Sequence, residues 1–232
     1  MDDFSEIVNC TDCSKSSGCF RHLLPAELEF INHNKTQILY SKGENICKEK
    51  AYASNVLYIA DGLVKVYLES PQHNRNINLK ILKASEFIGL SSIYGDNIYH
   101  YSAVALVDST ICMINKDSFR KILIDNGDFA SKIIKWYCNK EMQLFNRIKS
   151  LGLKQMHGRL ADVLLTLCDE TYDQDILFNN LSRKDIADFA CISTESTVRL
   201  LTELKNDGVI DLDGKKIILL DRKHLLEISR VG

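Results

Sequence analysis

The sequence predicts an α+β protein in which a strand-rich part is followed by a long helix and then by a smaller helical part. Three observations support this prediction. Short runs rich in β-branched and aromatic residues fill about 36–119, a helical apolar period covers 129–153, and two short helices with a terminal hairpin end the chain. A length of 232 residues suits one large domain or two smaller ones.

Composition and charge are those of an ordinary globular protein, with 45% hydrophobic residues and a net charge of −2. No run of 18 apolar residues predicts a membrane span, and the acidic start MDDFSEIVNC lacks the apolar core of a secretory signal. We therefore expect a cytoplasmic protein with no membrane partner. No nucleophile–base set, phosphate-binding glycine loop or paired carboxylate site is recognisable, so we do not expect an enzyme.

The strand-rich part consists of short alternating runs, namely TQILY, VLYIA, LVKVYL, NINLKIL, YSAVALV and TICMI. Turn residues such as Gly43, Pro71 and Gly95 separate them, which is typical of an antiparallel sandwich or barrel. The Asp61-Gly62 pair in IADGLVKVYL predicts a hairpin with a two-residue turn. A short helix is expected before these strands, at Pro25–His33.

The long helix has apolar residues at alternating spacings of three and four, which is the pattern of a helix that pairs with another helix. The residues of this seam are Ile134, Tyr137, Glu141, Leu144, Ile148 and Leu151. A single amphipathic helix packed on its own domain would show a similar pattern. A second apolar face (Ile133, Trp136, Met142, Phe145) favours a helix that does both. Glu141 would repel its own copy across a symmetric dimer.

The last part of the chain follows the pattern of a winged helix-turn-helix. Ser182 is placed to cap a helix over 183–189, a tight turn follows at 191–193, and a second helix spans 194–206. Asp207-Gly208 ends that helix, and two strands joined at Asp213-Gly214 follow. A further helix is expected before this unit, at 156–170.

The helix over 194–206 would present its first turns to DNA. An arginine there can bridge O6 and N7 of guanine, and a glutamate can accept from cytosine N4. Ser182, Arg183 and the wing could hold phosphates. The predicted DNA-binding residues are Ser182, Arg183, Thr194, Glu195, Ser196, Val198 and Arg199. Since residues 181–232 hold nine basic and nine acidic side chains, a winged helix used for protein contacts is the alternative.

The cysteines are the least expected feature of the sequence. Cys10, Cys13 and Cys19 crowd into ten positions of a polar segment that has no apolar period. Such a group could bind a metal, act as a thiol switch or be incidental. Cys47, Cys138, Cys168 and Cys191 lie in apolar patterns, and we expect them to be small buried hydrophobic residues.

The order of these elements resembles that of the CRP/FNR family of bacterial transcription regulators. The matching segments are DGLVKVYL, EFIGLSSIYG, AVALVDSTICMINKDSF and LSRKDIADFACISTESTVRLLTELKNDGVI. The resemblance implies a cysteine-bearing tail (1–20), a jelly-roll-like β-roll sensor domain (21–125), a dimerisation helix (126–153) and a winged helix-turn-helix DNA-binding domain (154–232). It also implies a homodimer on palindromic double-stranded DNA, with RNA polymerase as a further partner. Glu195 and Arg199 match the family's DNA-reading positions, whereas Val198 replaces the serine of FNR-type members.

The resemblance also suggests which signal the protein senses. The spacing of Cys10, Cys13 and Cys19 is similar to that of FNR, which holds a [4Fe-4S] cluster and senses oxygen. The family's fourth ligand lies in a segment A-L-x-x-S-x-x-C, where ALVDSTIC places Cys112. Nitric oxide is a second signal for such a cluster. Zinc, a thiol switch, a haem bound by one histidine or another small molecule are the alternatives.

Cyclic-nucleotide sensing, with cAMP as the ligand, is not expected. Members of the family that bind cyclic nucleotides pair the phosphate with an arginine that follows the segment corresponding to EFIGL. Arg75, which precedes this segment, is the only arginine between residues 22 and 119. A buried phosphate without a guanidinium would leave its charge uncompensated.

Overall fold

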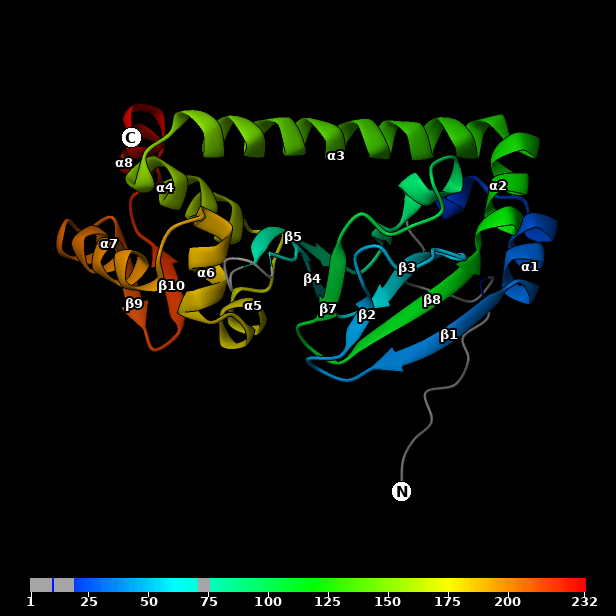
Figure 1. The fold of residues 1–232 in the computed structure, drawn as a ribbon, viewed down its shortest axis with the longest axis horizontal. Helices are drawn as coiled ribbons and strands as arrows, with labels where there is room; N and C mark the ends of the chain where they lie inside the picture. The colour runs from blue at the N-terminus through cyan, green and yellow to red at the C-terminus, as the bar shows by residue number, and fades with distance from the viewer. Residues whose placement is uncertain (1–9, 11–18, 71–75) are drawn as a thin grey trace, which may run out of the picture. The chain divides into compact units, whose positions relative to one another are not determined.

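The computed structural model describes residues 10, 19–70 and 76–232, and the chain divides into two compact units (Figure 1). Unit 1 consists of residues 1–66 and 81–140, and unit 2 of residues 67–80 and 141–232. The long helix α3 (Gly127–Leu153) contributes to both units.

The strand-rich part forms antiparallel sheets, as the sequence predicts. One sheet has the order β1-β8-β3-β6 and the other the order β2-β7-β4-β5. β8 pairs antiparallel with β1 and with β3, so it lies inside its sheet. The strands are β1 (Lys35–Tyr40), β2 (Asn45–Cys47), β3 (Asn55–Asp61), β4 (Leu63–Leu68), β5 (Ile77–Lys83), β6 (Phe87–Ile88), β7 (Ser102–Ala105) and β8 (Ser109–Asn115).

The hairpin predicted at Asp61-Gly62 is wrong. β3 and β4 follow each other in the chain but lie in different sheets, so the chain changes sheet at this point instead of folding back on itself. Gly62 has φ +102°, and a Cβ there would collide with Ser109. Glycine therefore permits the chain to turn sharply next to Ser109, the first residue of β8. An Asp-Gly pair is typical of tight hairpins, but here it lies at a corner between two sheets.

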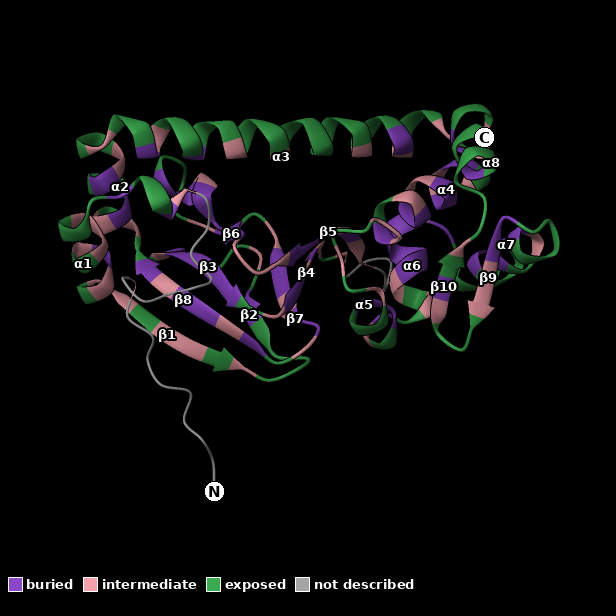
Figure 2. Ribbon diagram, turned by 180° about the vertical axis from the view of Figure 1, so that it is seen from behind, coloured by how far each residue is buried: buried purple, intermediate pink, exposed green. Residues whose placement is uncertain are grey.

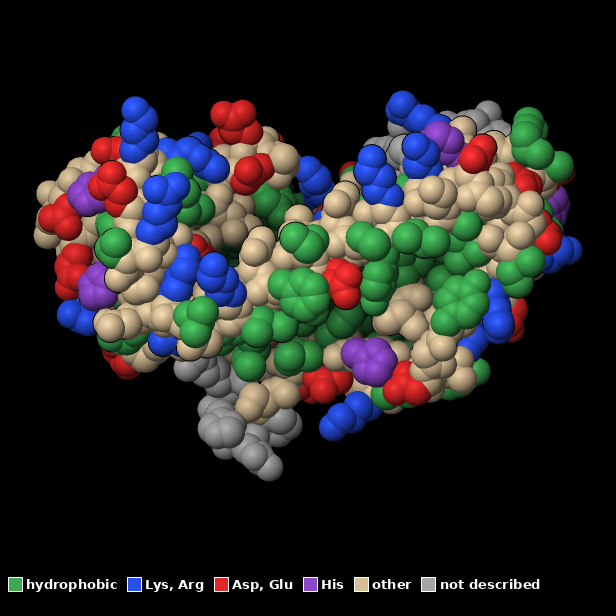
Figure 3. Space-filling model, turned by 90° about the horizontal axis from the view of Figure 1, so that it is seen from above, with side chains coloured by type: hydrophobic (Ala, Val, Ile, Leu, Met, Phe, Trp, Pro, Cys, Tyr) green, Lys and Arg blue, Asp and Glu red, His purple; other side chains and the backbone are tan. Residues whose placement is uncertain are grey.

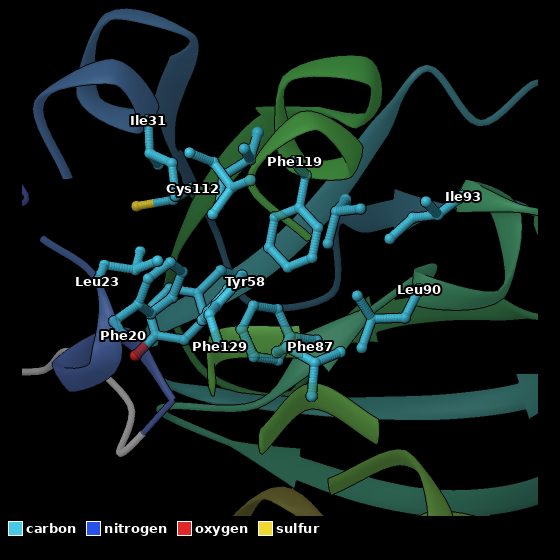
Figure 4. Close-up of a cluster of buried hydrophobic side chains, with 14 of the residues drawn as sticks. Phe20, Leu23, Ile31, Tyr58, Phe87, Leu90, Ile93, Cys112, Phe119 and Phe129 are labelled. Atoms are coloured by element: carbon cyan, nitrogen blue, oxygen red, sulfur yellow. The ribbon is translucent and has the colours of Figure 1, made fainter. Parts of the chain in front are cut away.

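Short helices close one end of unit 1 around a hydrophobic core (Figure 4). They are η1 (Phe20–His22), α1 (Pro25–His33), η3 (Leu90–Ile93) and α2 (Lys116–Asp125). Asn115 caps α2 by accepting from the backbone N–H groups of Asp117 and Ser118. The unit 1 core contains Phe20, Leu23, Ile31, Val56, Tyr58, Ala60, Phe87, Leu90, Ile93, Cys112, Ile114, Phe119, Ile122, Phe129 and Ile133.

α3 buries only a narrow stripe of its surface, whereas β3 and β8 are largely buried (Figure 2). Phe129 and Ile133 belong to the unit 1 core, and Trp136 is partly buried against it. Of the second apolar face predicted for this helix, Met142 and Phe145 are exposed. That face therefore splits into a buried part and an exposed part.

Unit 2 has the predicted helix-turn-helix followed by a hairpin. Ser182 caps α6 by accepting from the Asp185 N–H, and Cys191 adopts a left-handed conformation at the turn to α7. α5 and α8 were not predicted from the sequence. The elements are α4 (Met156–Leu167), α5 (Gln174–Asn180), α6 (Arg183–Ala190), α7 (Thr194–Asn206), β9 (Ile210–Asp213), β10 (Lys216–Leu219) and α8 (Arg222–Val231).

Over the residues that the structure describes, no helix combines the length and the apolar character needed to cross a membrane.

Candidate functional site

Cys112 occupies the middle of β8, where it is opposite Gln37 of β1 and Tyr58 of β3. Its side chain is 7% exposed and belongs to the unit 1 core. In Figure 4 its sulfur points to the side of the core where Ile31 and Leu23 lie. The strand position gives this thiol a fixed place, as a ligand on a rigid element requires.

Cys19 immediately precedes η1 and packs partly buried against the same core. Its carbonyl accepts from the His22 N–H at 3.1 Å, which forms the short helical turn. This turn directs the next side chain, Phe20, into the core, where its ring centroid lies 5.0 Å from that of Tyr58. The backbone at Cys19 is thereby fixed to the sheet that carries Cys112.

Cys10 is also partly buried against the unit 1 core. Its backbone N–H donates to Oδ1 of Asn32 in α1 at 3.2 Å. Three of the four predicted ligands therefore contact one hydrophobic cluster, although Cys112 lies about a hundred residues further along the chain than Cys10 and Cys19.

The fourth predicted ligand, Cys13, lies outside the described residues. Within residues 10, 19–70 and 76–232, no three His, Cys, Asp or Glu side chains converge closely enough to hold a metal ion. Thiolates are the ligands that iron-sulfur clusters and structural zinc require. The donor chemistry of the predicted set thus fits either group.

The remaining cysteines differ in their surroundings. Cys47 is buried, and burial raises the pKa of its thiol to about 12. Cys168 and Cys191 are partly buried. The prediction that Cys138 is buried is wrong, because this side chain lies on the exposed side of α3. The apolar pattern around it belongs to a surface and not to the core of its own chain.

Tyr101, which is partly buried, lies near the turn that follows β6. The Gly89 N–H donates to the Tyr101 hydroxyl oxygen at 3.1 Å, and Gly89 itself has φ +80°. Burial raises the pKa of Tyr101 to about 12, so this phenol is neutral at physiological pH. A neutral phenol does not offer the fixed positive charge that a buried phosphate needs.

In unit 2, α7 presents the predicted DNA-reading side chains on one surface. Thr194, Glu195 and Arg199 are exposed, and Val198 is 48% exposed, whereas Leu200, Leu201 and Leu204 are buried. Ser196 is partly buried and accepts from the hydroxyl of the capping residue Ser193 at 3.0 Å. The exposed first turns of α7 therefore have both donors and acceptors for base edges.

Arg199 is held by a neighbour on its own helix. Its Nη1 lies 3.3 Å from Oε1 of Glu203, and Oε2 of Glu203 lies 3.5 Å from Nε2 of His157 in α4. All three side chains are largely exposed, so the pair is weak and water competes with it. The weak pair with Glu203 leaves the Arg199 guanidinium accessible to another partner.

Ser182 and Arg183 have roles within the unit. The Ser182 hydroxyl donates to Asp185 Oδ2 at 2.6 Å as part of a capping box. The Arg183 guanidinium donates to the carbonyls of Gly214 and Lys215, both at 3.1 Å, and so supports the turn between β9 and β10. These contacts position the hairpin beside α6.

Two arginines that were not predicted from the sequence support the helix-turn-helix. Arg147 of α3 donates to the Phe189 carbonyl, and Arg159 of α4 donates to the Cys191 carbonyl at 3.4 Å. Both carbonyls lie at the C-terminal end of α6, where helix carbonyls lack intrahelical partners. Burial lowers the pKa of Arg147 below its usual value. A spacing pattern does not identify such residues, because their partners are backbone atoms.

The predicted seam of α3 lies on its exposed side. Ile134, Tyr137, Leu144 and Ile148 are each 47–63% exposed, and Leu151 is partly buried. Figure 3 shows hydrophobic side chains gathered along this helix. Cys138, Met142 and Phe145 widen the exposed apolar strip. Apolar strips of this extent usually mark an interaction surface.

The fold and these residues define a class of protein, the DNA-binding transcription regulators. The model of the cyclic nucleotide-binding domain matches residues 37–126, and that of the Crp-like helix-turn-helix domain matches residues 158–228. The chain belongs to the CRP/FNR family of transcription regulators.

The relatives include proteins that respond to different signals. The anaerobic regulatory protein of Bacillus subtilis is 26% identical, covering 89% of this chain and 92% of its own length. A CRP-like cAMP-activated global transcriptional regulator of Mycobacterium tuberculosis is 21% identical, covering 92% and 97%. The structure of FixK2 from Bradyrhizobium japonicum has a TM-score of 0.72 at 21% identity, covering 85% and 98%.

Proposed function

We propose that this regulator binds DNA while it holds a [4Fe-4S] cluster on Cys10, Cys13, Cys19 and Cys112, and that oxygen or nitric oxide ends DNA binding by destroying the cluster. The observation that supports the proposal most is the packing of Cys10, Cys19 and Cys112 against one hydrophobic core. The likeness to the anaerobic regulatory protein of Bacillus subtilis agrees with it.

The residues of the chain have separate tasks in this proposal. When bound, the cluster supplies an iron-sulfur centre that reacts with oxygen and nitric oxide and is destroyed by them. Cys112 provides the ligand on the rigid strand, and the contact of Asn32 with the Cys10 backbone keeps Cys10 close to α1. Because Cys10, Cys19 and Cys112 contact the unit 1 core, gain or loss of their ligand bonds changes the packing around the start of α3.

DNA binding in this proposal requires two copies of the chain. The exposed strip of α3 pairs with that of a second copy, and the two α7 helices then enter major grooves at half-sites one helical turn apart. Glu195 and Arg199 read bases at each half-site. The bound dimer acts on transcription by contact with RNA polymerase.

The ligand set is tested by anaerobic reconstitution with ferrous iron and sulfide. The wild type is expected to become coloured and to bind about four irons and four sulfides per chain. Cys112→Ser should bind much less, whereas Cys168→Ser, which replaces a partly buried thiol of unit 2, should match the wild type. A colourless wild-type protein that holds one zinc per chain would contradict the proposal.

A cyclic nucleotide is the second candidate signal, since the matched family model and the Mycobacterium tuberculosis relative both concern such ligands. The absence of arginine from residues 76–119 argues against it, because a buried phosphate needs a compensating positive charge. Calorimetric titration with cAMP, followed by a measurement of DNA affinity with and without cAMP, distinguishes the cluster from the cyclic nucleotide as the signal. Saturable binding that tightens DNA binding of the metal-free protein would favour this second function.

A further inference from the structure

Phe20 links the cysteine site to the long helix by direct ring contacts within unit 1. It follows Cys19 in the chain and is 6% exposed. Its ring centroid lies 5.9 Å from that of Phe129 in the first turns of α3 and 5.6 Å from that of Phe87 in β6. One side chain next to a predicted ligand therefore contacts both α3 and the strand beneath it.

The contact between Phe20 and Phe87 also leads to α3, because Phe87 packs against a residue of α3 two helical turns after Phe129. The Phe87 ring packs edge-on against Trp136, with centroids 5.6 Å apart and an interplanar angle of 84°. Phe129 and Trp136 are seven residues apart and so share one face of the helix. Phe20 thus reaches α3 at two points, directly through Phe129 and indirectly through Phe87.

An ion pair strengthens the second point of contact. Lys140, one turn after Trp136, pairs with Glu86, the residue that precedes Phe87. Both side chains are mostly shielded from water. The Lys140 ammonium also lies 5.5 Å from the centroid of the Trp136 ring. Residues 86–87 therefore hold one turn of α3 through an aromatic contact and a charge contact.

We propose that the aromatic chain Phe20–Phe87–Trp136, together with the Phe20–Phe129 contact, transmits the state of the cysteine site to α3. This inference depends on the proposed function, since it concerns the regulation of that site. Close-packed rings change position in discrete steps, because a packed core deforms little under a small displacement. A shift of the backbone at Cys19 moves Phe20, and Phe20 then changes the position of the α3 face that carries Phe129 and Trp136.

The chain has a built-in reporter for this transmission. Trp136 is its single tryptophan, so tryptophan emission comes from this ring alone. An iron-sulfur cluster lowers emission intensity by energy transfer, but energy transfer does not move the emission maximum. The wavelength of the maximum therefore reports the surroundings of Trp136 independently of such quenching.

The test compares Phe20→Leu with Phe30→Leu in the full-length protein, with and without reconstituted cluster. Phe30 of α1 is a matched control, because it packs partly buried against the same core and contacts Lys121 instead of the rings of the chain. Two quantities are measured: the shift of the emission maximum on cluster assembly, and the ratio of DNA dissociation constants without and with the cluster.

In the wild type and in Phe30→Leu we expect a shift of the maximum and a ratio of about tenfold or more. In Phe20→Leu, with the same iron content, both effects should be largely lost and the ratio should fall towards one. A Phe20→Leu protein that keeps the full ratio and shift would overturn the inference. A wild type that assembles no cluster, or whose DNA affinity is the same with and without the cluster, would overturn the proposed function and with it this inference.

A second variant covers the case in which Phe20→Leu fails to assemble the cluster. Trp136→Leu changes the far end of the chain, in α3, and leaves the residues beside the cysteines in place. Full iron content with a DNA-affinity ratio close to one supports transmission through Trp136. Full iron content with the wild-type ratio contradicts it.

Discussion

At the scale of single residues, Arg199 combines exposure with a weak internal partner, Glu203. An arginine that bridges guanine contributes about 1–3 kcal/mol of discrimination. Arg199→Ala should therefore weaken binding to a selected operator by roughly tenfold to a hundredfold and reduce the preference over random DNA. Fluorescence anisotropy with both DNAs measures this change.

Lys205→Ala is the matched control for that measurement. It removes the same charge from the last turn of α7, where Lys205 pairs with Asp211. We expect a small and sequence-independent loss of affinity, since a distant charge acts only on the phosphates. Equal losses in the two variants, on both DNAs, would show that Arg199 does not read sequence.

Cys47 gives a prediction for the dependence of stability on pH. Burial raises the pKa of its thiol from 9.0 to about 12, so the folded state keeps a proton that the unfolded state loses. Its contribution to the free energy of unfolding is complete below pH 9 and is lost as the pH rises towards 12, at about 1.4 kcal/mol per pH unit. Urea unfolding at pH 8 and pH 10.5 should show a smaller decrease for Cys47→Ala than for the wild type. Identical decreases would contradict this.

At the scale of the elements, the proposed function assigns association of two copies to the exposed strip of α3. Ile148 is 58% exposed and lies in the predicted seam, and Glu141 lies in the same seam. Ile148→Asp places a second carboxylate in each copy of the strip, so the dimer should weaken by at least tenfold. Glu141→Ala removes a like-charge contact and should strengthen it. Sedimentation equilibrium measures both constants, and unchanged constants would show that pairing uses another surface.

The elements also show what the sequence could and could not predict. Most strands, and helices with strong periodicity or clear caps such as α3, α6 and α7, were predicted because each signal is local. The two- and three-residue strands β6 and β2 were not predicted. The hairpin at Asp61-Gly62 was wrong, since a glycine with positive φ permits a corner between sheets as well as a turn. The helices α2, α5 and α8 were not predicted, although α2 and α8 are as long as the predicted helix α6 or longer.

The same limit applies to the sites. Three of the predicted cysteine ligands contact one core, a grouping that the spacing and the ALVDSTIC context suggested. Arg147 and Arg159 were not recognised, because they bind backbone carbonyls from distant parts of the chain. The prediction that Cys138 is buried was wrong, because an apolar pattern does not distinguish a hydrophobic core from an exposed apolar strip.

At the scale of the whole molecule, the proposed function requires that loss of the ligand bonds at Cys10, Cys13, Cys19 and Cys112 lowers affinity for DNA. Both wild-type protein and Cys112→Ser can be prepared anaerobically with iron and sulfide and then exposed to air. The variant controls for damage by oxygen at other cysteines, such as the exposed Cys138.

The most direct measurement is the dissociation constant for a selected operator, followed together with the visible absorbance before and after air is admitted. We predict that in the wild type the colour bleaches and the dissociation constant rises by about tenfold or more. In Cys112→Ser the affinity should be low from the start and should change little. A wild-type protein whose DNA affinity is the same before and after bleaching would contradict the account.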